Sequence, residues 1–171
     1  MFTRAKVFAG LLAASVLASS AASAMAQTPT RIGEFNDWGA FSYDSGGGKV
    51  CYALSVPTSK EPANVDHGDN FFLVTQRTKQ NVTYEPQFMA GYTLKESSKV
   101  TVSVDGKPFT FFTKENSAWV ENAAQEPALV AAMKAGTKMI VKAVSRRGTN
   151  TTYEYSLSGV TAALDAIQNC K

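Results

Sequence analysis

The pattern that most resembles a chemical motif is the glycine run Gly46-Gly47-Gly48 followed by Lys49. A phosphate-binding loop needs a first glycine five positions before its Gly-Lys pair, a Ser or Thr after the lysine, and a helix behind it. Here Val50 follows the lysine, and the next residues alternate between apolar and polar side chains as in a strand. The run therefore predicts a hairpin loop before a strand, and we expect no cofactor.

The single histidine of the chain, His67, is flanked by Asp66 and Asp69. These residues permit a small metal site with nitrogen and oxygen ligands, or a polar loop between strands. One histidine with two carboxylates lacks the three-ligand spacing of a zinc enzyme, so we expect no metal. A nucleophilic catalytic unit would also have to use His67, and no GxSxG or SxxK motif accompanies it. The sequence therefore predicts a protein that is not an enzyme.

Two adjacent arginines, Arg146 and Arg147, lie in a segment typical of a hairpin turn. They either contact an anionic partner or only keep the edge of a sheet soluble. With Asp66, His67 and Asp69 they form the set of candidate binding residues.

The N-terminus has the three parts of a secretory signal peptide: basic Arg4 and Lys6, a short apolar run, and small residues ending at Ala26. We therefore predict a signal peptide over residues 1–26, one domain over residues 27–171, and a periplasmic or secreted location. Removal of the peptide takes two of 17 basic residues and none of 14 acidic ones, which leaves a net charge of +1. This charge gives no reason to expect a nucleic-acid partner, and no later segment is long and apolar enough for a membrane span.

The two cysteines, Cys51 and Cys170, both lie in the exported part of the chain. In an oxidising compartment an even pair predicts a disulfide. A metal or redox pair would need CxxC spacing or further Cys and His ligands. We expect the bridge to tie the last helix to an early strand.

Period-2 alternation dominates the middle of the chain and predicts two hairpins. One has strands at 100–104 and 109–111 around Asp105-Gly106, and the other pairs 139–143 with 153–157 around a turn at 146–150. Further strands are expected at 35–43, 49–56, 70–76 and 87–93. Helices are expected in EPALVAAMKAG, with Gly136 as a left-handed cap, and in SGVTAALDAIQNC. Many short strands with turns between them favour an antiparallel sandwich or barrel.

These segments, in their order and spacing, resemble the invasion-associated locus B family of exported bacterial proteins. The resemblance lies in FNDWGAFSYDSGGGKVCYAL, FFLVTQR, FMAGYTLKESSKVTVSVDGKPFTFFTKENSAWV and ALVAAMKAGTKMIVKAVSRRGTNTTYEYSLSGVTAALDAI, with a cysteine close to the C-terminus. It implies a mainly β fold, a single-domain antiparallel immunoglobulin-like β-sandwich with two short helices, in the envelope of a Gram-negative bacterium.

The expected function is protein contact, with a partner in the bacterial envelope or on a host surface, and the family name points to host-cell invasion or adhesion. Two alternatives stay open. One is an envelope-maintenance protein with no host role, and the other is a metal-dependent periplasmic enzyme that uses the loop around His67.

Overall fold

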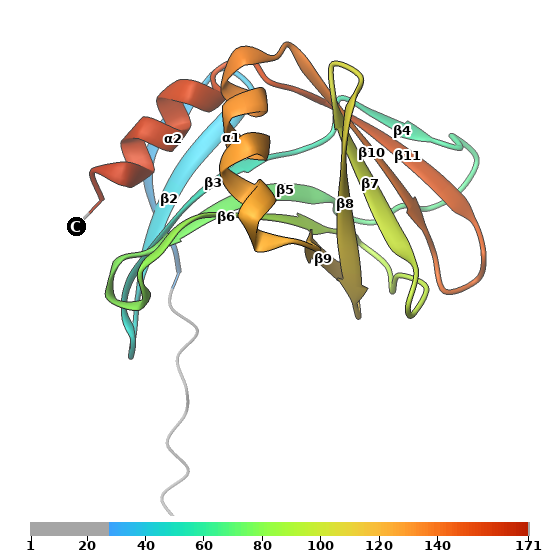
Figure 1. The fold of residues 1–171 in the computed structure, drawn as a ribbon, viewed down its shortest axis with the longest axis horizontal. Coiled ribbons are helices and arrows are strands. Elements are labelled where there is room, and N and C mark those ends of the chain that lie inside the picture. Colours follow the sequence, from blue (N-terminus) through green and yellow to red (C-terminus); the bar gives the residue numbers. More distant parts are fainter. Residues whose placement is uncertain (1–27, 171) are drawn as a thin grey trace, which may run out of the picture.

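The computed structural model describes residues 28–170, so the predicted signal peptide lies outside the described residues. All the strands belong to one antiparallel sheet, in the order β1-β2-β3-β5-β6-β9-β8-β7-β10-β11-β4. Figure 1 shows that this sheet is strongly curved, with α2 beside β2 and β3 and α1 nearer the middle, where it contacts β6 and β7. The predicted mainly β, antiparallel fold with two short helices is confirmed.

The elements follow one another with short connections. The strands are β1 (Thr30–Phe35), β2 (Trp38–Ser45), β3 (Gly48–Ser55), β4 (Ser59–Glu61), β5 (Phe71–Arg77), β6 (Val82–Met89), β7 (Lys99–Val104), β8 (Lys107–Lys114), β9 (Ser117–Val120), β10 (Lys138–Val144) and β11 (Asn150–Ser156). The α-helices are α1 (Glu126–Ala135) and α2 (Val160–Gln168), and short 3-10 turns cover Thr78–Gln80 and Ala123–Gln125.

Both predicted hairpins are confirmed. Asp105 and Gly106 form the turn between β7 and β8, and both have positive φ angles. In the β10–β11 hairpin Met139 lies opposite Tyr155, and Val141 lies opposite Tyr153. The glycine run forms the turn between β2 and β3, as expected.

Two of the predicted strands differ from the structure. The segment 35–43 contains a turn at Asn36, whose φ is 51°, so that β1 ends at Phe35 and β2 begins at Trp38. The segment predicted at 87–93 is displaced, because β6 begins at Val82 and ends at Met89. The residues that follow β6 therefore lie outside the named strands, and their link to the sheet is an isolated bridge between Leu94 and Ser145.

The sheet folds over so that its two halves pack their inner faces together, which is consistent with the predicted sandwich. Phe72 of β5 contacts the rings of Phe111 in β8 and Tyr155 in β11. Phe88 of β6 meets the ring of Tyr153. These rings come from strands far apart in the sheet order, and they are fully buried.

The helices complete the core. Leu129, Val130 and Met133 bury one face of α1, and α2 packs against β1, β2 and β3 through Val160, Ala163, Leu164 and Ile167. The predicted left-handed cap at Gly136 is wrong. Its φ is −90°, because the chain passes directly into β10 in an extended form.

Candidate functional site

The two predicted binding segments lie at one surface hollow of about 420 Å³. The Asp66–Asp69 loop follows β4, and Arg146 and Arg147 lie at the tip of the β10–β11 hairpin. They meet because β11 pairs with β4 in the sheet. The hollow, called here the first hollow, is lined by Asp66, His67 and Gly68 on one side, by Arg146 and Arg147 on another, and by residues 91–93.

A second hollow of about 660 Å³ adjoins the first. The two share Arg146 and the segment Gly91–Thr93 in their linings. Asp69, Glu115 and Asn116 line only the second hollow. Of the five predicted binding residues, the structure therefore places three at the first hollow, Asp69 at the second and Arg146 at both.

The segment that both hollows share is held by main-chain hydrogen bonds to its neighbours. Thr93 O accepts a bond from Arg146 N at 2.9 Å, and Ala90 N donates to Asn116 O at 2.8 Å. Leu94 N donates to Glu115 O, also at 2.8 Å. The segment Gly91–Thr93 is called here the floor of the two hollows. Because the floor is already ordered before a ligand binds, the entropy cost of binding is lower.

The Asp66–Asp69 loop and the shared floor touch each other main chain to main chain, and two glycines permit this approach. A Cβ atom on Gly91 would lie 2.5 Å from Asp69 N and from His67 O, and one on Gly68 would lie 2.8 Å from Gly91 O. Gly68 also has a φ of +58°, which favours glycine. Buried Asn70 joins the two segments, because its amide donates to His67 O at 2.9 Å and its Oδ1 accepts from Gly91 N at 3.3 Å.

His67 is a buried, fully hydrogen-bonded side chain and not a free ligand. Its exposed fraction is 6%, Nε2 lies 3.0 Å from Pro62 O, and Nδ1 lies 2.9 Å from the hydroxyl of Tyr153. No group of three His, Cys, Asp or Glu side chains suited to a metal ion occurs within residues 28–170. His67 thus lines the first hollow as a side chain held in place by its hydrogen bonds.

A chain of hydroxyl groups continues from His67 to Tyr92 and Thr151, which also line the first hollow. The Tyr153 hydroxyl lies 3.0 Å from that of Tyr92, which in turn lies 2.6 Å from Thr151 Oγ1. Burial raises the pKa of Tyr153 far above its ordinary value, with a further upward effect from its hydrogen bond to Tyr92. The Tyr153 hydroxyl therefore stays neutral at physiological pH and acts as a hydrogen-bonding support.

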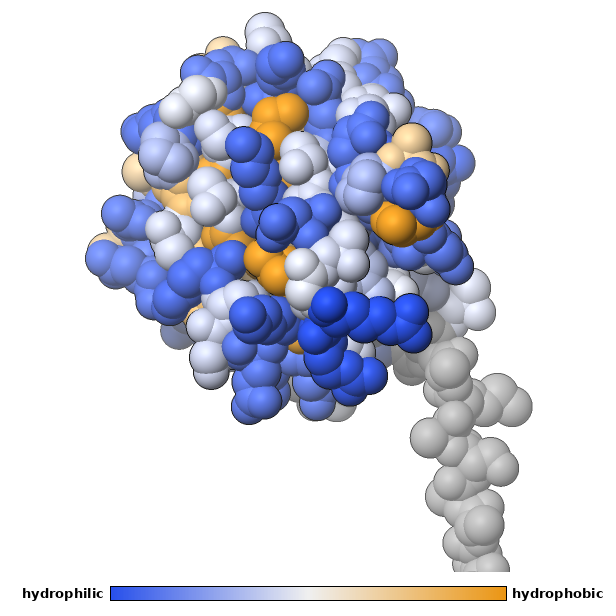
Figure 2. All heavy atoms as spheres, turned by 90° about the vertical axis from the view of Figure 1, so that its right-hand side faces the viewer, coloured by the Kyte–Doolittle hydropathy of each residue, from blue (hydrophilic) through white to orange (hydrophobic). Residues whose placement is uncertain are grey.

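The charged side chains of the hollows are solvent-exposed. Arg146 and Arg147 are both exposed and make no ion pair within the described part of the chain. Asp66 Oδ1 accepts a hydrogen bond from Gly68 N at 2.9 Å, which fixes the turn of its loop. Figure 2 shows the side of the molecule that carries β4, β10 and β11, and hydrophilic residues cover most of it. Such a surface suits a polar or charged ligand.

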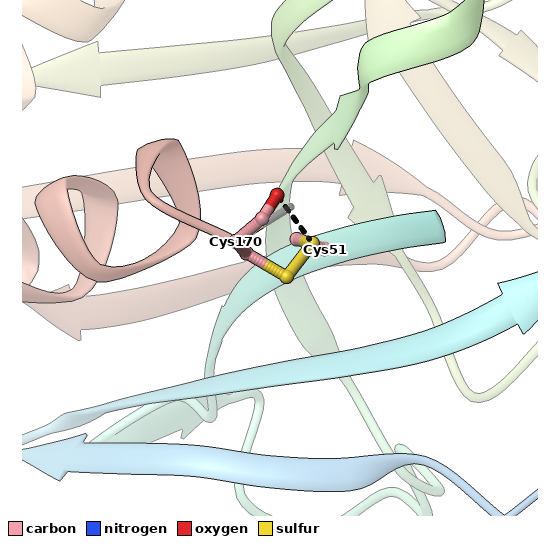
Figure 3. The surroundings of a disulfide bond; sticks show 2 residues. All are labelled: Cys51 and Cys170. Carbon is pink, nitrogen blue, oxygen red and sulfur yellow. Dashed lines mark hydrogen bonds between the residues drawn. A yellow bond between two sulfur atoms is a disulfide. The ribbon is translucent and has the colours of Figure 1, made fainter. Parts of the chain in front are cut away.

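The other residues considered for chemistry lie elsewhere. Cys51 of β3 and Cys170 beyond α2 form a disulfide, as predicted, and the bridge ties the end of the chain to the sheet (Figure 3).

Sequence reasoning missed the residues that build the floor. Asn70, Gly91 and Tyr92 have no motif around them, and the segment at 87–93 was expected to be a strand. The available signal was Gly91 inside that predicted strand, since a glycine within a strand often marks a close main-chain approach.

Comparisons with known proteins extend these observations. The family model described as Invasion associated locus B (IalB) protein matches residues 38–168. No curated protein matches the chain. The crystal structure of invasion associated protein b from Bartonella henselae is similar, with a TM-score of 0.58 and 14% sequence identity over 84% of this chain and 97% of that one. At this identity the likeness shows the fold.

No helix among residues 28–170 has the length and apolar character needed to cross a membrane. The family match covers the sheet from β2 onward, both helices and both hollows. The chain belongs to the invasion-associated locus B family.

Proposed function

We propose that this protein is exported and acts by binding another protein through the surface formed by the first and second hollows. One observation carries the proposal: segments about eighty residues apart converge on the ordered segment Gly91–Thr93, and there they present two arginines that have no ion-pair partner among residues 28–170. Exposed polar loops on a rigid scaffold are a common place for binding.

Export is supported by the disulfide, which is typical of oxidising compartments, and by membership of a family of exported proteins. The periplasm or the exterior is accordingly the proposed location, and the signal peptide ending near Ala26 remains a prediction. A role in invasion or adhesion rests on the family name, and envelope maintenance is the competing role.

A non-enzymatic role is favoured by the state of His67. Both of its ring nitrogens have hydrogen-bond partners, so neither is free to take a proton from a substrate or to bind a metal ion. The metal-dependent alternative receives no support from this geometry, and the proposal requires neither a cofactor nor a catalytic residue.

Affinity capture with residues 27–171 tests the proposal. The chain is immobilised and exposed separately to an envelope fraction of the source bacterium and to host-cell membranes. Specific capture of a host membrane protein would support adhesion or invasion, and capture of bacterial envelope proteins alone would support envelope maintenance.

The variant Arg146→Ala/Arg147→Ala should lose at least tenfold in captured partner, because both guanidinium groups are removed while the main-chain bonds of the hairpin remain. Arg31→Ala is a matched control, since Arg31 is exposed on β1 at the opposite end of the sheet order. Melting temperatures of both variants should match the wild type. Equal capture by the double variant would contradict the proposed surface.

A further inference from the structure

The charges of the two hollows differ in sign. The first hollow carries Arg146 and Arg147 against Asp66, and so has an excess of positive charge. The second carries Asp69 and Glu115 against the shared Arg146, and so has an excess of negative charge. The floor Gly91–Thr93 runs through both linings, so a single ligand can occupy both hollows at once.

We infer that the two hollows together bind an extended segment of a partner protein that carries an acidic side chain and, a few residues away, a basic one. The acidic group lies in the first hollow against Arg146 and Arg147, where arginine offers two parallel donors to a carboxylate. The basic group lies in the second hollow against Asp69 and Glu115. This inference rests on the proposed function and names the chemistry of its partner.

Charge complementarity excludes ligands of uniform charge from this arrangement. A nucleic acid or an anionic lipid surface would meet the arginines favourably but would be repelled by Asp69 and Glu115. A uniformly basic segment would meet the opposite difficulty at Arg147. Juxtaposed like charges penalise wrong partners more than matched charges strengthen the right one, so the hollows act mainly as a specificity device.

The test has to show where a ligand binds as well as how tightly. Short peptides are therefore titrated into the ¹⁵N-labelled chain, residues 27–171, and the amide resonances are followed by NMR. The probes are acetylated and amidated peptides with Asp and Lys separated by one, two or three glycines, since extended residues advance about 3.4 Å each. Matched probes replace Lys with Gln, or Asp with Asn. We expect the best Asp–Lys peptide to bind at least tenfold more tightly than either matched probe, with shifts in both hollows.

Substitutions that remove charge from one hollow at a time show which hollow recognises the acidic group and which recognises the basic group. Arg147→Gln should weaken the preference for Asp over Asn, because Arg146 alone remains, and leave the preference for Lys. Asp69→Asn/Glu115→Gln should do the reverse. Equal dissociation constants for the three kinds of peptide would overturn the inference, as would tighter binding of the acidic-only probe, shifts confined to another surface, or no saturable shift at millimolar peptide.

Failure of this inference can be distinguished from failure of the proposed function by testing both sets of variants in the affinity capture. If Asp69→Asn/Glu115→Gln captures the partner as well as the wild type while Arg146→Ala/Arg147→Ala does not, protein binding stands and the dipolar peptide is wrong. If neither pair of substitutions affects capture, the proposed function itself fails at this surface.

Discussion

Two tyrosines of β11 have different surroundings although they lie two residues apart on the same face. The Tyr153 hydroxyl has His67 and Tyr92 as hydrogen-bond partners. The Tyr155 hydroxyl is buried without any partner among the described residues. A buried polar group without a partner loses its hydration and gains nothing in return, so the two hydroxyl groups should contribute to stability with opposite signs.

Tyr153→Phe should lower the free energy of unfolding by about 1–3 kcal/mol, because it leaves the buried Nδ1 of His67 without its partner. Tyr155→Phe should leave stability unchanged or raise it by about 1 kcal/mol, since it removes an unsatisfied group. Chemical denaturation of the wild type and both variants measures the difference. A Tyr155→Phe variant that is as unstable as Tyr153→Phe would show that the Tyr155 hydroxyl has a partner.

At the scale of elements, the contact between the Asp66–Asp69 loop and the floor after β6 shapes both hollows. This contact joins two connections, not two strands, and is therefore fixed by glycines and by Asn70 instead of by ladder hydrogen bonds. Any side chain on Gly91 must push the two segments apart.

Gly91→Ala should therefore lower the free energy of unfolding by about 1–3 kcal/mol, the usual cost of overpacking. It should also shift amide resonances of the first hollow. Gly46→Ala is the matched control, because a Cβ there has nothing within 4 Å. That variant should be neutral or more stable by about 0.4–1 kcal/mol, through a less flexible unfolded chain. Equal stability of the two variants would contradict the close approach.

On the scale of the whole molecule, the disulfide joins β3 to the end of the chain across a sequence separation of 119. Helix α2 lies directly before Cys170 and packs on β1, β2 and β3, so the bridge holds the helix against one end of the curved sheet. Long closed loops restrict the unfolded chain most, and the chain-entropy model gives about 4–5 kcal/mol for a loop of this length.

Removing the bridge should lower the free energy of unfolding by up to about 4–5 kcal/mol. Cys51→Ala, Cys170→Ala and the double variant should lose similar amounts, because each lacks the same bond. Thiol labelling of the unfolded but unreduced wild type should find no free thiol. Two labelled thiols would show that the cysteines are unpaired, and unchanged stability in all three variants would show that the bridge contributes little.

Local sequence patterns were sufficient for much of the fold. Alternation around Asp105-Gly106 and around Arg146-Arg147 predicted both hairpins, and the spacing of apolar residues predicted α1 and α2. These patterns succeed because hairpins and helices are formed by residues close together in the chain. The chemical types of the candidate binding residues were visible as well, since the type of each side chain can be read directly from the sequence.

Only the tertiary structure decided where those residues meet. Strands β4 and β9 are too short to give a periodic signal, and β6 stops at Met89, two residues before the close approach of Gly91 to Gly68. His67 reads as a possible ligand in the sequence, but long-range packing against Tyr153 buries it. The convergence of Asp66 and Arg146 depends on β4 pairing with β11, and such pairing between distant segments is set by burial across the whole sheet, which no local pattern records.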